Sequence, residues 1–274
     1  MKYSFGLRGH DIADNFDDMC SVASNNNICE IQFAMAKTIK DINFYSVGYN
    51  TEISERVRKK LNENNLKVSV MGCYINPVNQ DIKLLEKDLN LFKNFLLYAK
   101  DFEATVIGTE TGSMGNITDT HSKENYLFFL NNLSPLICKA EDIGVMIGVE
   151  PVWYDTISSP IVMNRMLKDA KSENIGVILD VANMISEDNR DKQCDVISQA
   201  FELFADKIKT IHLKDFTFEN GEKKIVLAGT GELDINYLFD KIEEYDVDCQ
   251  FILDETRIED YNQSLRMIKS ILNI

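Results

Sequence analysis

The chain has 274 residues, of which 45% are hydrophobic, and its formal net charge at pH 7 is −15. This length suits one soluble α/β barrel with a sizeable core, or two small domains. A nucleic-acid surface needs clustered lysine and arginine, so the negative charge argues against nucleic acid as a partner. No apolar run approaches the roughly 20 residues that span a bilayer, so we expect no membrane partner. A small, neutral or modestly charged substrate fits better.

Six cysteines are scattered along the chain without any Cys-x-x-Cys pair. The first residues, Met-Lys-Tyr-Ser-Phe, lack the basic stretch and long apolar core of a secretory signal peptide. We therefore expect reduced, mostly buried thiols in a cytoplasmic protein.

Strand-like apolar runs alternate with segments of helical spacing along the whole chain. The predicted strands lie near residues 2–8, 28–33, 66–75, 104–109, 145–150, 175–180, 208–213 and 249–254. The predicted helices lie near residues 12–24, 52–65, 81–101, 123–142, 160–173, 195–206, 234–245 and 260–272. This alternation predicts an α/β fold, a single (β/α)8 TIM barrel that forms one domain over residues 1–274. An open doubly wound sheet is the alternative, but Gly6-Leu7-Arg8-Gly9 is not its usual Gly-x-Gly-x-x-Gly turn.

Four predicted strands in the second half end on residues that can bind a metal ion. Glu150, Asp180 and His212 follow predicted strands five, six and seven, and Asp254-Glu255 follows strand eight. The carboxyl ends of parallel strands point the same way, so these side chains should converge at one mouth of the barrel. Carboxylates gathered there would repel one another unless a divalent cation lay between them. The pattern therefore predicts one metal site.

The identity of the fourth ligand depends on the direction of the last strand's side chains. Side chains alternate along a strand, so only one of Asp254 and Glu255 can face the barrel interior. We favour Glu255, because Phe251 and Leu253 share its parity and would continue a row that faces the barrel. Asp254 is the alternative on the same argument.

Four segments of the second half resemble the xylose isomerase-like TIM-barrel superfamily, and within it the sugar phosphate isomerase/epimerase branch of ketose 3-epimerases and inosose isomerases. The segments are Gly148-Val149-Glu150-Pro151, Ile178-Leu179-Asp180-Val181-Ala182-Asn183, Ile211-His212-Leu213-Lys214-Asp215 and Ala228-Gly229-Thr230-Gly231-Glu232-Leu233-Asp234. The resemblance implies a Glu-Asp-His-Glu site for Mn²⁺, with Mg²⁺, Co²⁺ or Zn²⁺ as alternatives, in which both glutamates also move protons. In this sequence those residues would be Glu150, Asp180, His212 and Glu255. It also implies a possible homo-oligomer.

Two positions depart from the pattern of ketose epimerases in this branch. Those enzymes commonly carry a histidine three residues after the strand-six aspartate and an arginine shortly after the strand-seven histidine. Asn183 and the Lys214-Asp215 pair stand at these places. The Lys214-Asp215 pair is more similar to the inosose branch, which leaves the substrate open.

The expected chemistry is proton transfer next to a carbonyl group. A divalent cation that chelates a substrate carbonyl and hydroxyl acidifies the adjacent C–H bond. Glu150 and Glu255 could flank the substrate, one removing the proton and the other returning it to a metal-bound enediolate. This predicts an isomerase or epimerase of carbohydrate metabolism that acts on a sugar, a sugar phosphate or a polyol-derived ketone such as an inosose. Loss of a β-hydroxyl group would instead make the protein an inosose-type dehydratase.

Further residues are candidates for substrate binding. Glu110, at the end of predicted strand four, and Asn183 could hold substrate hydroxyl groups. Trp153 could stack on a sugar face, or form a lid or subunit contact. Lys214 could bind a substrate oxygen or form a structural ion pair with Asp215 or a nearby carboxylate. Arg257 could bind a carboxylate or phosphate, or be solvated.

Two other functions are compatible with this fold. An endonuclease-IV-like hydrolase would use a histidine-rich trinuclear zinc cluster, whereas this chain has three histidines and a strong negative charge. A non-catalytic sugar-binding barrel would keep the fold and lose ligands, and Glu150, Asp180 and His212 are all present.

Arg8 and His10, which follow the first predicted strand, could also belong to the pocket.

Overall fold

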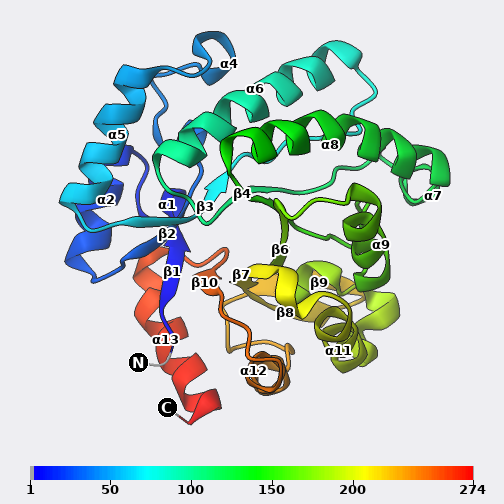
Figure 1. Cartoon of the computed structure of the whole chain (residues 1–274). Helices are drawn as coiled ribbons and strands as arrows, with labels where there is room; N and C mark the ends of the chain where they lie inside the picture. The colour runs from blue at the N-terminus through cyan, green and yellow to red at the C-terminus, as the bar shows by residue number, and fades with distance from the viewer. Residues whose placement is uncertain (1–2, 274) are drawn as a thin grey trace.

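Eight parallel strands close into a barrel in the computed structural model, which describes residues 3–273 (Figure 1). The strands are β1 (Phe5–Arg8), β2 (Glu30–Phe33), β3 (Lys67–Gly72), β4 (Val106–Thr109), β5 (Ile147–Val149), β6 (Ile175–Leu179), β7 (Ile208–Leu213) and β10 (Gln250–Leu253). Their order around the barrel is β1-β10-β7-β6-β5-β4-β3-β2. The predicted TIM barrel is confirmed; residue 2 of the first predicted strand lies outside the described residues.

Eight longer helices surround the barrel and correspond to the predicted ones. They are α2 (Phe16–Asn25), α5 (Thr51–Glu63), α6 (Ile82–Asp101), α8 (Lys123–Ile143), α9 (Pro160–Ala170), α11 (Gln193–Phe204), α12 (Ile235–Glu244) and α13 (Ile258–Leu272). Most of them begin after an Asn, Asp or Ser whose side chain accepts a hydrogen bond from a free N–H of the first turn, as Ser122 does at α8. These caps fix where the polar loops end and the helices begin.

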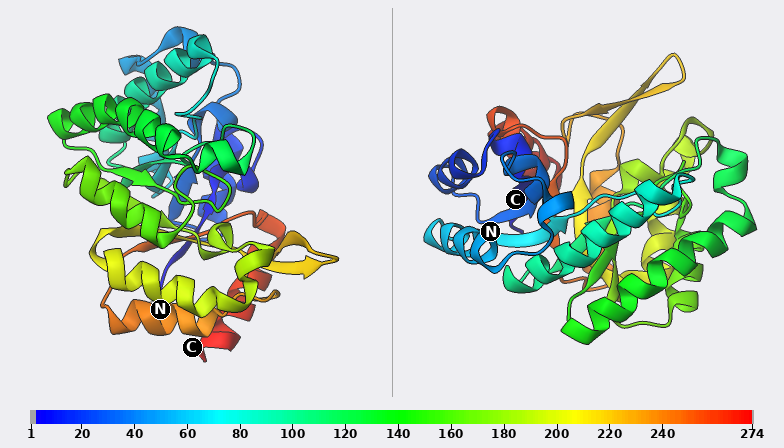
Figure 2. Two further views of the ribbon diagram at one scale, coloured as in Figure 1. Left: turned by 90° about the vertical axis from the view of Figure 1, so that its right-hand side faces the viewer. Right: turned by 90° about the horizontal axis from the view of Figure 1, so that it is seen from above.

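Several short elements were not predicted from the sequence. They are α1 (Gly9–Ile12), α3 (Met35–Thr38), α4 (Phe44–Val47), α7 (Ile117–Thr120), α10 (Val181–Met184), two 3₁₀ turns at Glu187–Lys192 and Ala205–Lys207, and the antiparallel pair β8 (Asp215–Glu219) and β9 (Glu222–Val226). One-turn helices are too short to produce a recognisable hydrophobic period. The β8–β9 hairpin follows β7 and projects from the barrel as a yellow arm (Figure 2).

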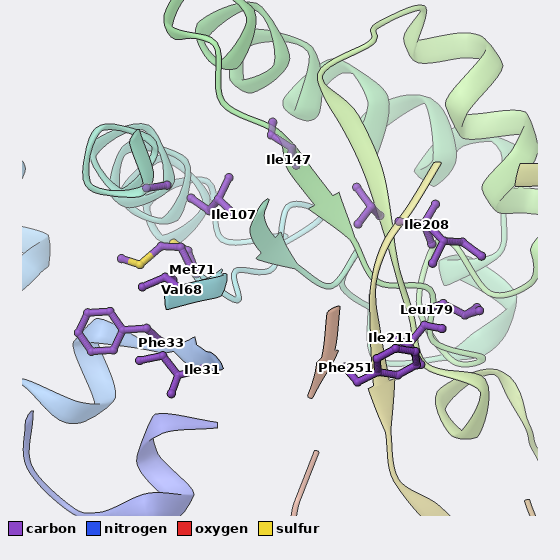
Figure 3. Close-up of a cluster of buried hydrophobic side chains, with 14 of the residues drawn as sticks. Ile31, Phe33, Val68, Met71, Ile107, Ile147, Leu179, Ile208, Ile211 and Phe251 are labelled. Atoms are coloured by element: carbon purple, nitrogen blue, oxygen red, sulfur yellow. The ribbon is translucent and has the colours of Figure 1, made fainter. Parts of the chain in front are cut away.

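The hydrophobic core has two layers, one inside the barrel and one between the barrel and its helices. Figure 3 shows part of the outer layer, including Ile147, Leu179 and Phe251. A small separate cluster that contains Val70 and Ile178 fills the inside. Glycines make room for it: a Cβ atom at position 108 would lie only 2.7 Å from Val70 Cγ1 and 2.8 Å from Ile178 Cδ1. Consecutive residues therefore serve different layers, as pleated strands require.

The structure also bears on the cysteines and on the membrane. All six cysteines are unpaired, and two of them, Cys20 and Cys73, are buried. The other four are exposed or partly exposed, which is less burial than we predicted. Among residues 3–273, no helix combines the length and the apolar character that a transmembrane span requires.

Candidate active site

Each strand of the barrel delivers one side chain to the carboxyl-terminal mouth. The eight residues are Arg8, Gln32, Tyr74, Glu110, Glu150, Asp180, His212 and Asp254. All have even numbers, and each continues the row of side chains that faces the barrel interior in its own strand. A cavity of about 240 Å³ opens among them, and only Asp180 of the eight does not line it. The prediction that strand ends converge on one site is thus supported by the geometry.

Glu150, Asp180 and His212 form the centre of this mouth. One potential ligand atom of each lies within 4.8 Å of the others, and the residues are 2%, 0% and 3% exposed. Neither ring nitrogen of His212 has a hydrogen-bond partner within residues 3–273, and Oδ2 of Asp180 accepts no hydrogen bond there. Asp180 Oδ2 lies 3.1 Å from Lys214 Nζ and His212 Nδ1 lies 3.4 Å from Glu150 Oε2, but His212 Nε2 has neither a hydrogen bond nor an ion pair among these residues. Buried polar atoms are normally satisfied, so this nitrogen indicates a missing partner. Carboxylate oxygens and an imidazole can hold a divalent cation.

Two neutral donors hold the carboxylate of Glu150. Asn183, in α10, donates from Nδ2 to Oε1 over 2.7 Å, and the Tyr74 hydroxyl donates to Oε2 over 3.2 Å. Gln32 donates in turn from Nε2 to the Tyr74 oxygen over 3.1 Å. His212 Nδ1 lies 3.4 Å from the same Glu150 Oε2. Such outer contacts fix the orientation of a ligand or base.

A buried lysine lies between the carboxylates. Lys214 Nζ is 2.8 Å from Asp254 Oδ2 and 3.1 Å from Asp180 Oδ2. Burial by itself lowers the pKa of Lys214, but the charges of Asp180, Asp254 and Glu150 outweigh burial and raise that pKa. Its ammonium is therefore charged across the physiological range. Asp215 is not its partner, since that carboxylate accepts hydrogen bonds from four backbone N–H groups.

The structure brings Asp254, and not Glu255, into the buried centre. The parity argument for Glu255 was wrong, because Phe251 and Leu253 belong to the outer core layer, where the Phe251 ring stacks on Phe239 at 5.3 Å. Ile252 lies opposite His212 in the β10–β7 register and shares its inward direction, as Asp254 does two residues later.

Glu255 lies at the rim of the cavity. The backbone N–H of Asp254 still bonds to the β7 carbonyl of Leu213 over 3.1 Å. Glu255 then takes a left-handed φ of 50°, which ends the strand. Its side chain is 45% exposed, and its Oε1 lies 3.9 Å from Lys214 Nζ. Glu255 therefore lines the cavity without joining the buried cluster.

Two cations hold the Asp254 carboxylate. Arg8 Nη1 is 3.0 Å from Oδ1, while Lys214 binds Oδ2. Burial raises the pKa of Asp254, but the charges of Lys214, His212 and Arg8 together keep it below its usual value. A permanently ionised carboxylate suits a ligand or counter-ion better than a proton carrier.

Glu110 has the opposite electrostatic character. Burial and then the negative charges of Glu150 and Asp155 raise its pKa to about 8. Its loop is fixed by Asp155, whose Oδ2 accepts from the backbone N–H groups of Thr111 at 3.1 Å and Gly112 at 2.8 Å. Burial likewise raises the pKa of Asp180, to about 6, against the charge of Lys214. Glu110 therefore offers a proton to the cavity near neutral pH.

Three predicted substrate-binding residues, Trp153, Arg257 and Asn183, do not line the cavity. Trp153 is partly buried beside Asn183, whose carbonyl accepts its backbone N–H over 2.9 Å, and its ring meets Tyr154 edge-on at 5.4 Å. Arg257 is exposed at the start of α13. The side chain of Asn183 donates a hydrogen bond to Glu150, so its contact with substrate stays a prediction.

Three residues of the cavity were not singled out from the sequence. Gln32 and Tyr74 follow the inward rows of β2 and β3, and Lys37 comes from the short helix α3. Continuing the even-numbered row from each strand end would have found the first two. Lys37 gave no such signal, because α3 was not predicted.

Comparisons with known proteins agree with this architecture. A family model described as xylose isomerase-like TIM barrel matches residues 29–271. Among curated proteins, no sequence matches this chain.

Solved structures share the fold at low sequence identity. A D-tagatose 3-epimerase-like protein superposes with a TM-score of 0.79 and 16% identity, over 98% of this chain and 97% of the other. The IolI protein, solved with a zinc atom, gives 0.72 and 16% over 98% and 96%. D-psicose 3-epimerase, solved in the presence of D-fructose, gives 0.72 and 14% over 99% and 100%.

Proposed function

This chain belongs to the xylose isomerase-like TIM barrel family, and on that premise we propose that it is a divalent-metal-dependent isomerase or epimerase. Its substrate is a sugar, a sugar phosphate or a polyol-derived ketone such as an inosose. The observation that carries the proposal is the buried cluster of Glu150, Asp180 and His212 at the mouth of a small polar cavity. Unsatisfied ligand atoms in that cluster support a cation as the missing partner.

The donor set fits a divalent cation. Glu150, Asp180 and His212 would hold it, with Asp254 taking the place first given to Glu255. Carboxylate oxygens with one imidazole suit Mn²⁺, and also Mg²⁺, Co²⁺ or Zn²⁺. When bound, the cation would polarise the substrate carbonyl and acidify the neighbouring C–H bond.

Glu150 is the proposed base. Its two oxygens accept hydrogen bonds from Asn183 and Tyr74, which keep the carboxylate in one orientation beside the cavity. Both donors are neutral, so they orient the carboxylate without a compensating positive charge. A fixed carboxylate beside an acidified carbon can remove its proton.

Glu255 is the proposed second proton carrier. It follows β10, which is separated from β5 by two strands in the barrel order, so it approaches the cavity from another side than Glu150. Its half-exposed carboxylate can exchange protons with water. Return of the proton to the same carbon from the second side gives epimerisation, whereas return to the neighbouring carbon gives isomerisation.

Lys214 and Glu110 are the proposed partners of substrate oxygens. The charged ammonium of Lys214 lines the cavity and stabilises negative charge that develops on an oxygen during proton removal. Glu110, with its raised pKa, donates a hydrogen bond to a hydroxyl group near neutral pH. Lys214 follows the strand-seven histidine, where ketose epimerases of the resembling branch carry an arginine, and Asn183 stands at the place of their histidine.

Solvent deuterium uptake tests the proposal. The Mn²⁺-loaded protein would be incubated in D₂O with ketoses, ketose phosphates and inososes, and each compound followed by NMR. We expect deuterium next to the carbonyl of at least one compound, loss of that exchange in Glu150→Gln, and retention in the control Glu202→Gln, which removes an exposed carboxylate.

Other outcomes would replace the proposal. Release of water from a substrate, with formation of a dehydrated ketone, would favour the dehydratase. Binding of sugars without exchange or product, in a protein that holds Mn²⁺, would favour the non-catalytic barrel. Exchange that persists in Glu150→Gln would show that another residue is the base.

A further inference from the structure

Two basic side chains lie on one side of the cavity. Arg8 ends β1, and Lys37 comes from α3, just after the neighbouring strand β2. Glu110 and Glu150 end β4 and β5, and β5 lies four strands from β1 in the closed order. The wall formed by Arg8 and Lys37 therefore faces the proposed base, and Asp254 and Glu255, which follow the neighbouring strand β10, lie beside it.

Lys37 is the unpaired member of this wall. Within residues 3–273, no carboxylate oxygen lies within 4.0 Å of Lys37 Nζ, so Lys37 makes no ion pair there. The ammonium is exposed at the edge of the cavity. A lysine that lines a cavity without a protein partner is free to bind an anion.

Arg8 retains unused donors. Its Nε donates to Asp11, and its Nη1 lies 3.0 Å from Asp254. Its Nη2 makes no hydrogen bond within the described part of the chain. A guanidinium has five N–H donors, so Arg8 can hold Asp254 and still offer donors to a ligand.

Gln32 supplies an independent sign of a missing ligand. It is 3% exposed and lines the cavity at the end of β2. Its Nε2 donates to Tyr74, but its Oε1 is buried and has no partner within residues 3–273. An unsatisfied buried acceptor that lines the same cavity as two cations suits a hydroxyl group next to an anionic one.

His10 lies near the two cations of this wall. Its buried Nδ1 has no partner among the described residues. Burial first, and then the charges of Lys37 and Arg8, lower the pKa of His10 to about 4. The ring is therefore neutral at physiological pH and does not compete with the two cations for an anion.

We infer that the wall formed by Arg8, Gln32 and Lys37 binds an anionic group, a carboxylate or a phosphate, at the end of the substrate remote from the reacting carbonyl. The inference rests on the proposed function and narrows its substrates to acidic sugars or sugar phosphates. A cavity of about 240 Å³ fits a compact acyclic or monocyclic molecule of this kind.

Binding of three matched probes tests the inference without turnover. Ribitol, ribonate and ribitol 5-phosphate share a carbon chain and lack the reacting carbonyl. Their affinities would be measured by calorimetry for the wild type, for Lys37→Met and for the control Lys40→Met, with saturating Mg²⁺ and again with EDTA. Lys40 is 63% exposed and pairs with Asp14, outside the cavity.

We expect the wild type and Lys40→Met to bind one anionic probe at least about tenfold more tightly than ribitol, and Lys37→Met to lose most of that preference. The preferred probe distinguishes a carboxylate from a phosphate. Equal affinities for the three probes, no binding of any probe, or a preference that survives in Lys37→Met would each overturn the inference.

The two proposals can fail separately. A Lys37-dependent preference for an anionic probe, without deuterium exchange on any ketone, would support the anion site and overturn the proposed isomerase or epimerase activity. Exchange on neutral ketoses by a protein that shows no anion preference would support the isomerase or epimerase and overturn the anion site.

Discussion

Lys214 Nζ lies 2.8 Å from Asp254 Oδ2 and 3.1 Å from Asp180 Oδ2, so one buried ammonium joins two carboxylates from different strands. Both carboxylates are almost fully buried, as is Lys214. In the absence of a metal ion, Lys214 is therefore the main source of positive charge between them. Removing one partner of such a group leaves uncompensated buried charge.

Lys214→Met should destabilise the metal-free protein by about 3 kcal/mol or more, because Asp180 and Asp254 would lose the ammonium between them and Asp254 would keep only Arg8. A bound divalent ion supplies the lost positive charge, so Mn²⁺ should restore part of the stability. Urea unfolding with EDTA and with Mn²⁺ measures both effects.

The control is Lys224→Met, which removes an exposed lysine paired with Glu219 on the β8–β9 hairpin. Its stability should change by less than about 0.5 kcal/mol. If Lys214→Met were as stable as this control in EDTA, the buried ion pairs would not contribute as we argue.

Asp254→Asn and Glu255→Gln separate the two candidates for the fourth ligand. Asp254 is buried against Lys214 and Arg8, whereas Glu255 is 45% exposed. Asp254→Asn should weaken Mn²⁺ binding about tenfold or more, and Glu255→Gln should leave it nearly unchanged while slowing deuterium exchange. Electron paramagnetic resonance of free Mn²⁺ gives the affinities. The reverse ranking would restore Glu255 as the ligand.

Asn183→Leu removes the 2.7 Å hydrogen bond to Glu150 Oε1 with little change in volume. We expect the exchange rate to fall about 10- to 100-fold, because residues that orient a ligand or base typically contribute this much. Asn183→Gln, which keeps the amide, should recover part of the rate. An unchanged rate in Asn183→Leu would mean that Tyr74 alone orients Glu150.

Glu110 should make stability depend on pH in the metal-free protein. Its pKa is raised to about 8, so between about pH 4.5 and 8 the unfolded chain loses a proton that the folded protein keeps. The stability that this proton contributes is complete below the lower value and is lost as pH rises through the upper one.

Glu110→Gln removes this dependence. Relative to the variant, the wild type should lose stability as pH rises, by at most about 1.4 kcal/mol per pH unit and by less where water screens the group. Urea unfolding at pH 5 and pH 8 in EDTA compares the two, with the exposed Glu86→Gln as the control. A constant difference between the proteins at both pH values would contradict a raised pKa.

Asp215 anchors the chain on either side of the hairpin. Its Oδ1 accepts from the N–H groups of Phe216 and Leu233, and its Oδ2 from those of Gly229 and Gly231, at 2.8 to 3.2 Å. Asp215→Ala leaves four donors without this partner and should cost about 3 kcal/mol or more. Thermal unfolding measures the loss, and Asp215→Asn, which retains one carbonyl acceptor, should lose less.

The order of strands and helices was predictable because local patterns encode it. Apolar runs that end on Glu150, Asp180 and His212 recur at the spacing of βα units, and parallel strands bring such ends together whatever their loops. The barrel and the convergence of these three residues could therefore be read from the chain. The resemblance to the family rests on the same segments and is confirmed by the matching family model.

The direction in which the side chains of the last strand point could not be predicted in the same way. Phe251, Ile252 and Leu253 are all apolar, because one face of the strand packs on helices and the other closes the barrel. The polarity of these residues therefore does not tell which of them face the barrel interior. The backbone register with β7 decided that Asp254 points inward. Only the closed sheet supplies that register.

The sequence by itself determined the barrel and the three strand-end ligand candidates, because hydrophobic period and strand polarity are local properties. The tertiary structure decided which groups share the cavity: that Lys214 pairs with Asp180 and Asp254, and that Lys37 joins the wall of Arg8. These contacts join residues far apart in the chain, and their charges depend on burial. Local sequence carries neither distance nor burial, so only the folded barrel fixes them.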